Sequence, residues 1–452
     1  MTATRAPGAP ALLHGLPASA AQRWFLTESV EGLNNWHLMV ALRVHARFER
    51  EPLAAALHEL VARHEALRTT LRQSGERLEQ LIWDRRPLPV HEHAIERPED
   101  VDALLLRLIE ERITLDGGEL TRADVLVTGA EEHVVAFRIH HALVDGYACG
   151  LVAAELTALY GACLSGRRAS LEPVAVQARE HMAREELPPN AAARAYWRGH
   201  LVPRAPGAVA AIPLRPPLPS TSQGVELPEL PADAVRDLAQ LGATLRAPLP
   251  LALLATVASV FHANGAADLR VCFVHGGRYR PEYAGVVGAL AGLLPLRIDL
   301  DGDDLTYRAL LARVHRAWIG AIAHRAPIDE ILRALDPAAA ARPFWELEFN
   351  FQLDDAQPAG DDAAAADAHG IRIEPVMPPF SERATLIPRD TCEPYAGYLC
   401  GMQPSGAVQV VTAFVTREIG AAERAVAARL DLRAALPRVT GEPDRRLREL
   451  LR

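Results

Sequence analysis

The stretch Arg138–Gly150, RIHHALVDGYACG, places a histidine pair, a carboxylate and a glycine at the junction of a strand and a helix. Upstream of the histidines the residues alternate as in a β-strand, and one face carries Val135, Phe137 and Ile139. His141 shares the parity of this apolar face, so we expect its ring to be partly desolvated. Burial disfavours the imidazolium ion, and the neutral ring that results can accept a proton.

The turn after the histidines supplies a second chemical feature. Asp145 and Gly146 interrupt the strand, and the apolar spacing of residues 151–160 predicts a helix that leaves the turn. A glycine at the start of a helix lets a substrate approach the backbone and offers an N–H group to a developing oxyanion. Metal binding is not expected, because adjacent strand residues such as His140 and His141 point to opposite faces. No HExxH or CxxC pattern accompanies the pair.

Composition excludes several classes of protein. A chain of 452 residues exceeds one ordinary core, so two or three domains are expected. The net charge of −9 argues against nucleic-acid binding, which requires a basic surface. The sequence has no apolar run of about 18 residues that would predict a membrane span, and the first residues do not resemble a signal peptide.

The cysteines are Cys149, Cys163, Cys272, Cys392 and Cys400. Their scattered spacing fits neither disulfides nor zinc and predicts a cytoplasmic protein.

The segment His140–Gly146, HHALVDG, resembles the HHxxxDG signature of the CoA-dependent acyltransferase superfamily. That superfamily includes chloramphenicol acetyltransferase and the condensation domains of nonribosomal peptide synthetases. Arg63–Thr69, RHEALRT, is similar to the RHExLRT motif of the condensation domains and precedes HHALVDG, as it does there. Two motifs in this order indicate the condensation domains more specifically than either motif alone.

Shorter segments extend the resemblance over about residues 16–435. Ser19–Leu26 is similar to the opening S-x-A-Q-x-R motif, although Trp24 occupies the position of its arginine. Residues 343–352, PFWELEFNFQ, alternate as a strand and resemble the FNYQ strand of peptide-forming members. A departure occurs at residues 290–293, where LAGL stands in place of the usual F-V-N-T.

The resemblance implies an α/β sandwich fold. Two chloramphenicol-acetyltransferase-like halves would form a V-shaped pseudo-dimer around a central tunnel, which substrates enter from opposite mouths. We expect an N-terminal half of residues 1–175, which carries HHALVDG, and a C-terminal half of residues 176–452.

The resemblance also assigns a reaction centre. It implies that His141 meets the attacking nucleophile and that Gly146 lies beside the reacting thioester. Tyr147 and Gly292, two positions where the chain departs from the family pattern, would line the tunnel. No metal ligand is implied.

Three further residues would support the turn, namely His140, Asp145 and Arg68. The resemblance places Arg68 in a buried salt bridge with Asp145. The alternative for the segment around Arg68 is an exposed charged end of a helix.

The reaction implied is attack by an amine or hydroxyl acceptor on an acyl or aminoacyl thioester, which yields an amide or an ester. The enzyme would bind no cofactor, because the phosphopantetheine arm of a peptidyl or acyl carrier protein presents the substrate. The sequence has no adenylation domain and no Gly-Gly-x-Ser attachment site, so we expect a free-standing enzyme with its carrier in trans, unless the chain is a domain excised from a longer protein. The departures at Tyr147 and Gly292 favour an unusual acceptor, such as a small soluble amine or alcohol.

Two other functions stay open. The first is an O- or N-acyltransferase of the same fold that uses acyl-CoA. The second is a catalytically silent member that recruits a partner, and the intact HHALVDG argues against it. The sequence has no GxSxG elbow, so a covalent acyl-enzyme is not expected.

Overall fold

The computed structural model divides the chain into two compact units. Unit 1 comprises the residues up to Glu186, Gly276–Ala291 and part of 355–384, and unit 2 comprises Leu187–His275 and the remaining segments. The structure describes residues 10–27, 33–34, 36–75, 77–95, 97, 99–111, 113–201, 221–226, 228–263, 265–335, 347–352, 371–376, 395–402, 405–416 and 432–451.

The main sheet of unit 1 has five strands in the order β14-β3-β9-β8-β6. They are β14 (Ile373–Val376), β3 (His37–Val44), β9 (Glu132–His140), β8 (Thr121–Gly129) and β6 (Val90–Ala94). Neighbouring strands are antiparallel except β6 and β8, and His37 lies opposite His140 in the pairing of β3 with β9. The strand predicted before HHALVDG is therefore confirmed as β9.

Two smaller sheets and several helices complete unit 1. The smaller sheets contain β1 (Leu12–Pro17), β5 (Arg77–Trp83) and β4 (Thr69–Ser74), and β2 (Leu33–Asn34) with β7 (Ile113–Thr114). The helices are α1 (Ala20–Thr27), α2 (Arg50–Arg63), η1 (Glu65–Arg68), α3 (Asp100–Glu110), α4 (Gly146–Leu164), α5 (Ala178–Glu185) and η2 (Pro281–Tyr283).

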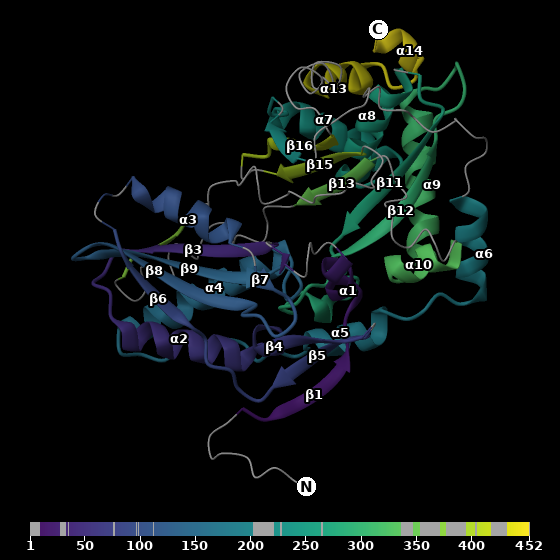
Figure 1. Ribbon diagram of the computed structural model, residues 1–452. Coiled ribbons are helices and arrows are strands. Elements are labelled where there is room, and N and C mark those ends of the chain that lie inside the picture. The colour runs from purple at the N-terminus through teal and green to yellow at the C-terminus, as the bar shows by residue number, and fades with distance from the viewer. Residues whose placement is uncertain are drawn as a thin grey trace. The chain divides into compact units, whose positions relative to one another are not determined.

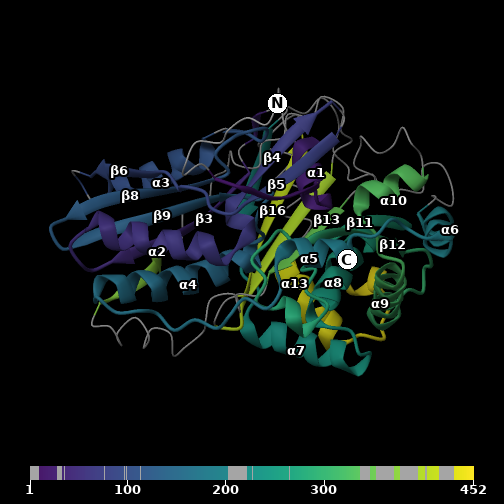
Figure 2. The same cartoon turned by 90° about the horizontal axis from the view of Figure 1, so that it is seen from below.

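Helices cover both faces of the five-stranded sheet, with α3 on one side of β3 and α2 on the other (Figure 1). Val135, Phe137 and Ile139 of β9 pack in one core with α2 and α4, which lie side by side (Figure 2). Val134 and Ala136 pack in a second core with α3. Because both faces of β9 are buried, its central residues are almost all apolar.

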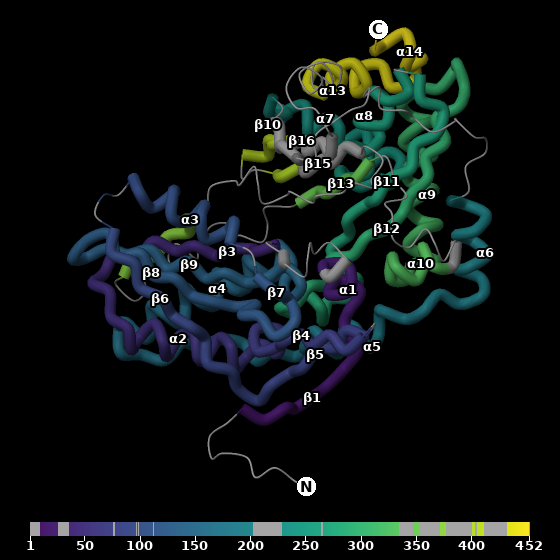
Figure 3. The backbone as a smooth tube through the Cα atoms, in the orientation of Figure 1, coloured from purple at the N-terminus to yellow at the C-terminus, as the bar shows by residue number. Residues whose placement is uncertain are grey.

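Unit 2 is built on a six-stranded sheet in the order β10-β16-β15-β13-β11-β12 (Figure 3). The strands are β10 (Thr221–Glu226), β16 (Val408–Thr416), β15 (Tyr395–Met402), β13 (Leu347–Gln352), β11 (Asp268–His275) and β12 (Gly292–Asp299). The helices are α6 (Ala191–His200), α7 (Ala232–Thr244), α8 (Leu249–Ala263), α9 (Tyr307–Ala323), α10 (Ile328–Leu335), α13 (Leu432–Gly441) and α14 (Leu447–Leu450). Apolar residues of the helices and of one sheet face, among them Leu347 and Phe349, form a single core. Both units are thus layered α/β structures, as expected.

The observed division differs from the expected boundary near residue 175. The first segment of unit 1 extends to Glu186, because α5 contacts the segment Gly276–Ala291 through His181. That segment interrupts unit 2 between β11 and β12 but belongs to unit 1. Strand β14 also returns to unit 1, where it pairs with β3.

Helix α4 is, among the described residues, the one unbroken helix long and apolar enough to cross a membrane by length and composition, with 19 residues and a mean hydropathy of 1.4. Helices α7 and α8 meet the same criterion only as one segment that bends by 102°. In the structure α4 is a core helix of unit 1, because Val152, Leu156 and Leu159 are fully buried in its apolar core.

Candidate active site

The turn between β9 and α4 carries the predicted site residues. His140 is the last residue of β9, and Asp145 is the N-cap of α4, which begins at Gly146. One carboxylate oxygen of Asp145, Oδ1, accepts a hydrogen bond from the backbone N–H of Ala148 at 2.8 Å. This bond satisfies an N–H group that the first turn of a helix would otherwise leave unpaired.

His141 is held by both its backbone and its ring. Its N–H donates to the carbonyl of Trp36 at 2.7 Å, and its ring centroid lies 4.8 Å from that of Phe25 in α1. Burial lowers the pKa of His141, against a smaller raising effect of the carbonyls of His141 and Val144. The ring is therefore neutral at pH 7, in agreement with the desolvation that strand parity predicted.

His140 is fully buried and is bound on several sides. Its Nδ1 accepts from the N–H of Ala142 at 3.0 Å, and its own N–H donates to the carbonyl of Leu120 at 2.8 Å. Its ring meets those of His37 and Phe25 edge to face. Burial holds the pKa of His140 well below its usual range. A neutral ring bonded to the turn backbone fits the supporting role implied for this residue.

Asp145 forms a buried ion pair, but with Arg278 rather than Arg68. The guanidinium donates to Oδ2 at 2.8 Å and to Oδ1 at 3.1 Å. Oδ2 also accepts from the backbone N–H groups of Leu290 and Ala291, each at 2.9 Å. With five donors around its two oxygens, the carboxylate fixes the turn and is unsuited to accept a proton from substrate.

The expected pairing of Arg68 with Asp145 is wrong. Arg68 donates to the carbonyls of Val61 and Ala62 near the end of α2, and to that of Trp83 at 2.7 Å. The last carbonyls of a helix lack intrahelical partners, so a neighbouring guanidinium is drawn to them. Arg68 therefore ties α2 to β5 and does not reach the turn.

Arg278 is the site residue that sequence reasoning missed. The sequence feature that could have indicated Arg278 is the dipeptide Gly276-Gly277, which lies directly before it after β11. Gly277 has a φ of +68°, and a Cβ there would collide with the carbonyl oxygen of Leu290. Only glycine permits this turn, and the turn aims Arg278 at Asp145.

The start of α4 is open to solvent. Gly146 is exposed, and Tyr147 is 39% exposed, with its ring centroid 4.3 Å from the Arg278 guanidinium. Gly292 lies in unit 2, opposite His275 in the pairing of β11 with β12. A Cβ on Gly292 would come within 2.7 Å of the His275 ring, so a side chain there would require that ring to move. That Tyr147 and Gly292 line a tunnel stays a prediction.

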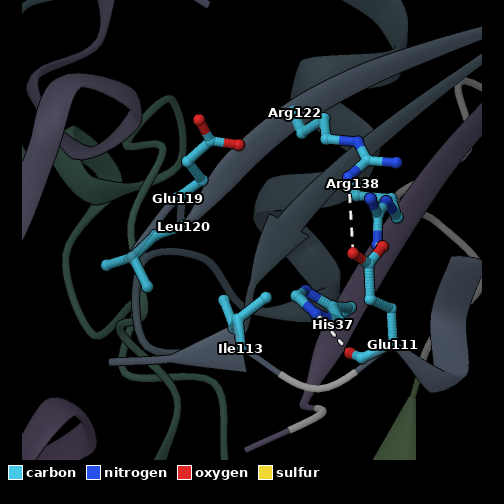
Figure 4. Close-up of a pocket in the computed structure, with 7 residues that line it drawn as sticks. All are labelled: His37, Glu111, Ile113, Glu119, Leu120, Arg122 and Arg138. Atoms are coloured by element: carbon cyan, nitrogen blue, oxygen red, sulfur yellow. Dashed lines mark hydrogen bonds and ion pairs between the residues drawn. The ribbon is translucent and has the colours of Figure 1, made fainter. Parts of the chain in front are cut away.

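A small cavity of about 60 Å³ lies beside His37 in unit 1 (Figure 4). Its lining residues are His37, Glu111, Ile113, Glu119, Leu120, Arg122 and Arg138. His37 donates from Nε2 to the carbonyl of Glu111 at 3.0 Å, and Arg138 pairs with the Glu111 carboxylate at 2.8 Å. Burial and the charge of Arg138 lower the pKa of His37 to about 4. Neutral His37 therefore packs against neutral His140.

The described residues hold no cluster of three or more His, Cys, Asp or Glu that could bind a metal ion. What the turn offers is a neutral imidazole directly after a buried strand and an exposed glycine, with its backbone N–H, at the start of a helix. The first can accept a proton, and the second can stabilise a developing oxyanion.

Comparison with known proteins identifies relatives over most of the chain. The model of the condensation domain family matches residues 13–384. The chain is 28% identical over 369 residues to chondramide synthase cmdD of Chondromyces crocatus, in an alignment that covers 78% of this chain and 9% of that protein. It is 26% identical over 372 residues to the beauvericin nonribosomal cyclodepsipeptide synthetase of Beauveria bassiana, with coverage of 79% and 12% respectively. The chain thus spans about a tenth of the length of these two relatives.

Solved structures share the fold over the full length. The X-domain from teicoplanin biosynthesis has a TM-score of 0.78 at 24% identity, with 97% of this chain and 98% of that chain covered. The first condensation domain of the CDA synthetase has a TM-score of 0.67 at 18% identity, with coverage of 97% and 99%. The family match spans well over half of the residues, and nonribosomal peptide synthetases are prominent among the curated relatives. The chain is therefore a member of the condensation domain family, of the type found in those synthetases.

Proposed function

We propose that this condensation domain joins an amine or hydroxyl acceptor to an acyl or aminoacyl group that a carrier protein holds as a thioester. The observation that carries the proposal is the neutral, desolvated ring of His141, which contacts the rings of Phe25 and Trp36 and lies five residues before the exposed start of α4. A thioester needs no metal to react with an amine, but the attack needs alignment and an acceptor for one proton.

The residues divide this work between them. His141 accepts the proton of the attacking nucleophile or holds that nucleophile in line. As the C–N or C–O bond forms, the C–S bond of the thioester breaks, and the proton passes to the sulfur of the departing phosphopantetheine thiol. Alignment of two bound reactants can contribute roughly 7–11 kcal/mol, and a positioned proton acceptor about two to four orders of magnitude in rate. The N–H at Gly146 is available to the oxyanion, and Asp145 with Arg278 keeps the turn in place.

The carrier would act in trans, with its phosphopantetheine arm as the only non-protein group in the reaction. We place the reaction in the cytoplasm, in keeping with Cys149, Cys163, Cys272 and Cys400, which are free thiols. Cys392 lies outside the described residues.

Intact-mass spectrometry of an acyl-loaded carrier protein tests the proposal directly. Loss of the acyl group from the carrier, with formation of an amide or ester on the supplied acceptor, is the expected result. The same acyl group presented on CoA distinguishes the acyl-CoA-dependent alternative, which would transfer equally well without a carrier. A free acceptor and the same acceptor tethered to a second carrier, compared side by side, decide how the acceptor is presented. No transfer from carrier or CoA to any acceptor would contradict the proposal.

A further inference from the structure

His181 is a buried histidine of α5 whose ring donates to one backbone atom. It is 4% exposed, and its Nε2 lies 2.9 Å from the carbonyl oxygen of Gly277. A carbonyl oxygen only accepts hydrogen bonds, so Nε2 carries the proton. Burial lowers the pKa of His181, so the ring is neutral at pH 7. The ring is therefore an uncharged donor directed at the Gly277 carbonyl.

The acceptor of this bond belongs to the peptide group that joins Gly277 to Arg278. Because a peptide group is planar, a donor that fixes its carbonyl also fixes the direction in which the chain enters Arg278. Gly277 has a φ of +68°, and glycine has little conformational preference of its own. The bond from His181 thus selects one orientation of the peptide group at a point where the backbone itself does not.

Both sides of the bond are anchored within unit 1. The ring of Tyr283 meets that of His181 edge to face, with 4.7 Å between the centroids. Tyr283 is fully buried, and its hydroxyl donates to Oε1 of Glu185 in α5 at 3.0 Å. An apolar cluster reinforces the contact of α5 and the residues before it with the segment Gly276–Ala291, and its buried members are Val176, Tyr283, Val286 and Leu290. The donor and the carbonyl are therefore held against each other by more than their own hydrogen bond.

We propose that His181 is a positioning residue for condensation and acts on Arg278 through the Gly277 carbonyl. This inference rests on the proposed condensation and adds a residue to its machinery. The Arg278 guanidinium donates to both carboxylate oxygens of Asp145, which caps the helix that begins at Gly146. With the carbonyl held by His181, the guanidinium meets the carboxylate and the start of α4 stays in place. His181 needs no contact with substrate in this arrangement.

Two variants separate the donor from the volume of the ring. In His181→Gln the amide N–H can take the place of Nε2, whereas His181→Met fills a similar volume without a donor. We expect His181→Met to lower kcat at least about tenfold with little change in KM for the carrier, and His181→Gln to stay within about threefold of the wild type. If His181→Met does not fold, His181→Asn replaces it, because its shorter amide does not reach the carbonyl. An unchanged kcat without the donor, or equal losses with and without it, would overturn the proposal.

His133→Met is the matched control. His133 is as buried as His181, lies in unit 1 and bonds to a backbone carbonyl, that of Ala46, at 3.0 Å. Its loss should lower the melting temperature and leave kcat of the folded enzyme unchanged. A loss of kcat equal to that of His181→Met would show that any buried histidine of unit 1 has this effect, which would refute a positioning role.

The Nε–H group of Arg278 reports on positioning without any reaction. This nitrogen is buried, so its proton exchanges slowly with water, and its signal in a proton–nitrogen correlation spectrum is assigned by its absence from Arg278→Lys. We expect His181→Met to shift or broaden the signal, and His181→Gln and His133→Met to leave it in place. An unmoved signal in His181→Met would contradict the proposal. If the wild type condenses no substrate, the condensation proposal fails, and the Arg278 signal still decides whether His181 positions the arginine.

Discussion

At the scale of single residues, the position of His141 in the fold determines the protonation state and the orientation of its ring. His141 directly follows β9, and the alternation of that strand predicted that its ring would be desolvated and therefore neutral. Its orientation depends on Phe25 and Trp36, which are distant in sequence and bear no recognisable spacing to it. Local patterns therefore predict the chemical state of the ring, and long-range packing determines where it points.

Replacement of His141 by alanine should lower the condensation rate by about two to four orders of magnitude, because the proton acceptor is lost. The melting temperature should change little, since His141 is only partly buried as a residue and its Nδ1 makes no hydrogen bond that the substitution would remove. Single-turnover assays with an acyl-loaded carrier give the rate, and His58→Ala is the control because His58 is exposed on α2. A His141→Ala rate close to that of the wild type would remove the ring from the mechanism.

His37 should make stability depend on pH in a defined window. Its pKa is about 4 in the folded protein and near 6.5 in the unfolded chain, so the unfolded state binds more protons between these values. The free energy of unfolding should therefore rise with pH from about 4 to 6.5, by up to ~1.4 kcal/mol per pH unit from this residue. Urea unfolding of wild type and His37→Gln across this range measures the effect. Parallel pH profiles would contradict it.

At the scale of elements, one turn depends on a segment from a distant part of the chain. The HHALVDG pattern predicted the strand, the turn and the helix, because these are set by residues close in sequence. The partner of Asp145 lies 133 residues further on, and no local pattern joins the two. Arg68 was a plausible partner by motif alone, but the end of α2 offered its guanidinium nearer acceptors.

Removal of either partner of the Asp145–Arg278 pair should destabilise unit 1 by about 3–5 kcal/mol, since the other is left as a buried unpaired charge. The double variant Asp145→Ala/Arg278→Ala should cost less than the sum of the single variants. Chemical denaturation of all four proteins provides the cycle. Arg68→Ala serves as the control, because its effect should add to that of Asp145→Ala. If Asp145 showed an interaction energy with Arg68 and none with Arg278, the Asp145–Arg68 pairing implied by the motif would be correct after all.

Gly277→Ala should distort the turn that carries Arg278. The alanine Cβ would meet the backbone of Leu290, and a positive φ adds strain of about 1–3 kcal/mol. Gly276→Ala is the matched control, because a Cβ at Gly276 meets no atom within 4 Å and its φ is not positive. We expect lower thermal stability and a lower condensation rate for Gly277→Ala only. Equal behaviour of the two variants would show that the turn tolerates a side chain.

At the scale of the whole molecule, the two units are each discontinuous in sequence. The sequence predicted two α/β halves, and both exist as layered units. The predicted boundary rested on loop composition. Loop composition does not show that Gly276–Ala291 and β14 return to unit 1. Returning segments are held by long-range contacts, so they could not be predicted from local pattern.

A fragment of residues 1–186 should therefore not form a stable unit 1. It lacks Arg278, the N–H groups of Leu290 and Ala291, and strand β14, so Asp145 is left without most of its donors. Circular dichroism and hydrogen exchange should show helices and strands with little protection and no cooperative melting. A fragment that melts cooperatively near the temperature of the full chain would contradict this expectation.

The separation of Asp145 and Arg278 along the sequence also determines the order in which the parts of the site are synthesised. A ribosome adds about 5–20 residues per second, so the 133 residues between them take about 7–27 s to make. For that interval the nascent chain holds β9, the histidine turn and α4 without the counter-charge of Asp145. The reaction centre is completed only when the ribosome has passed β11, so maturation of the first unit waits for translation of the second.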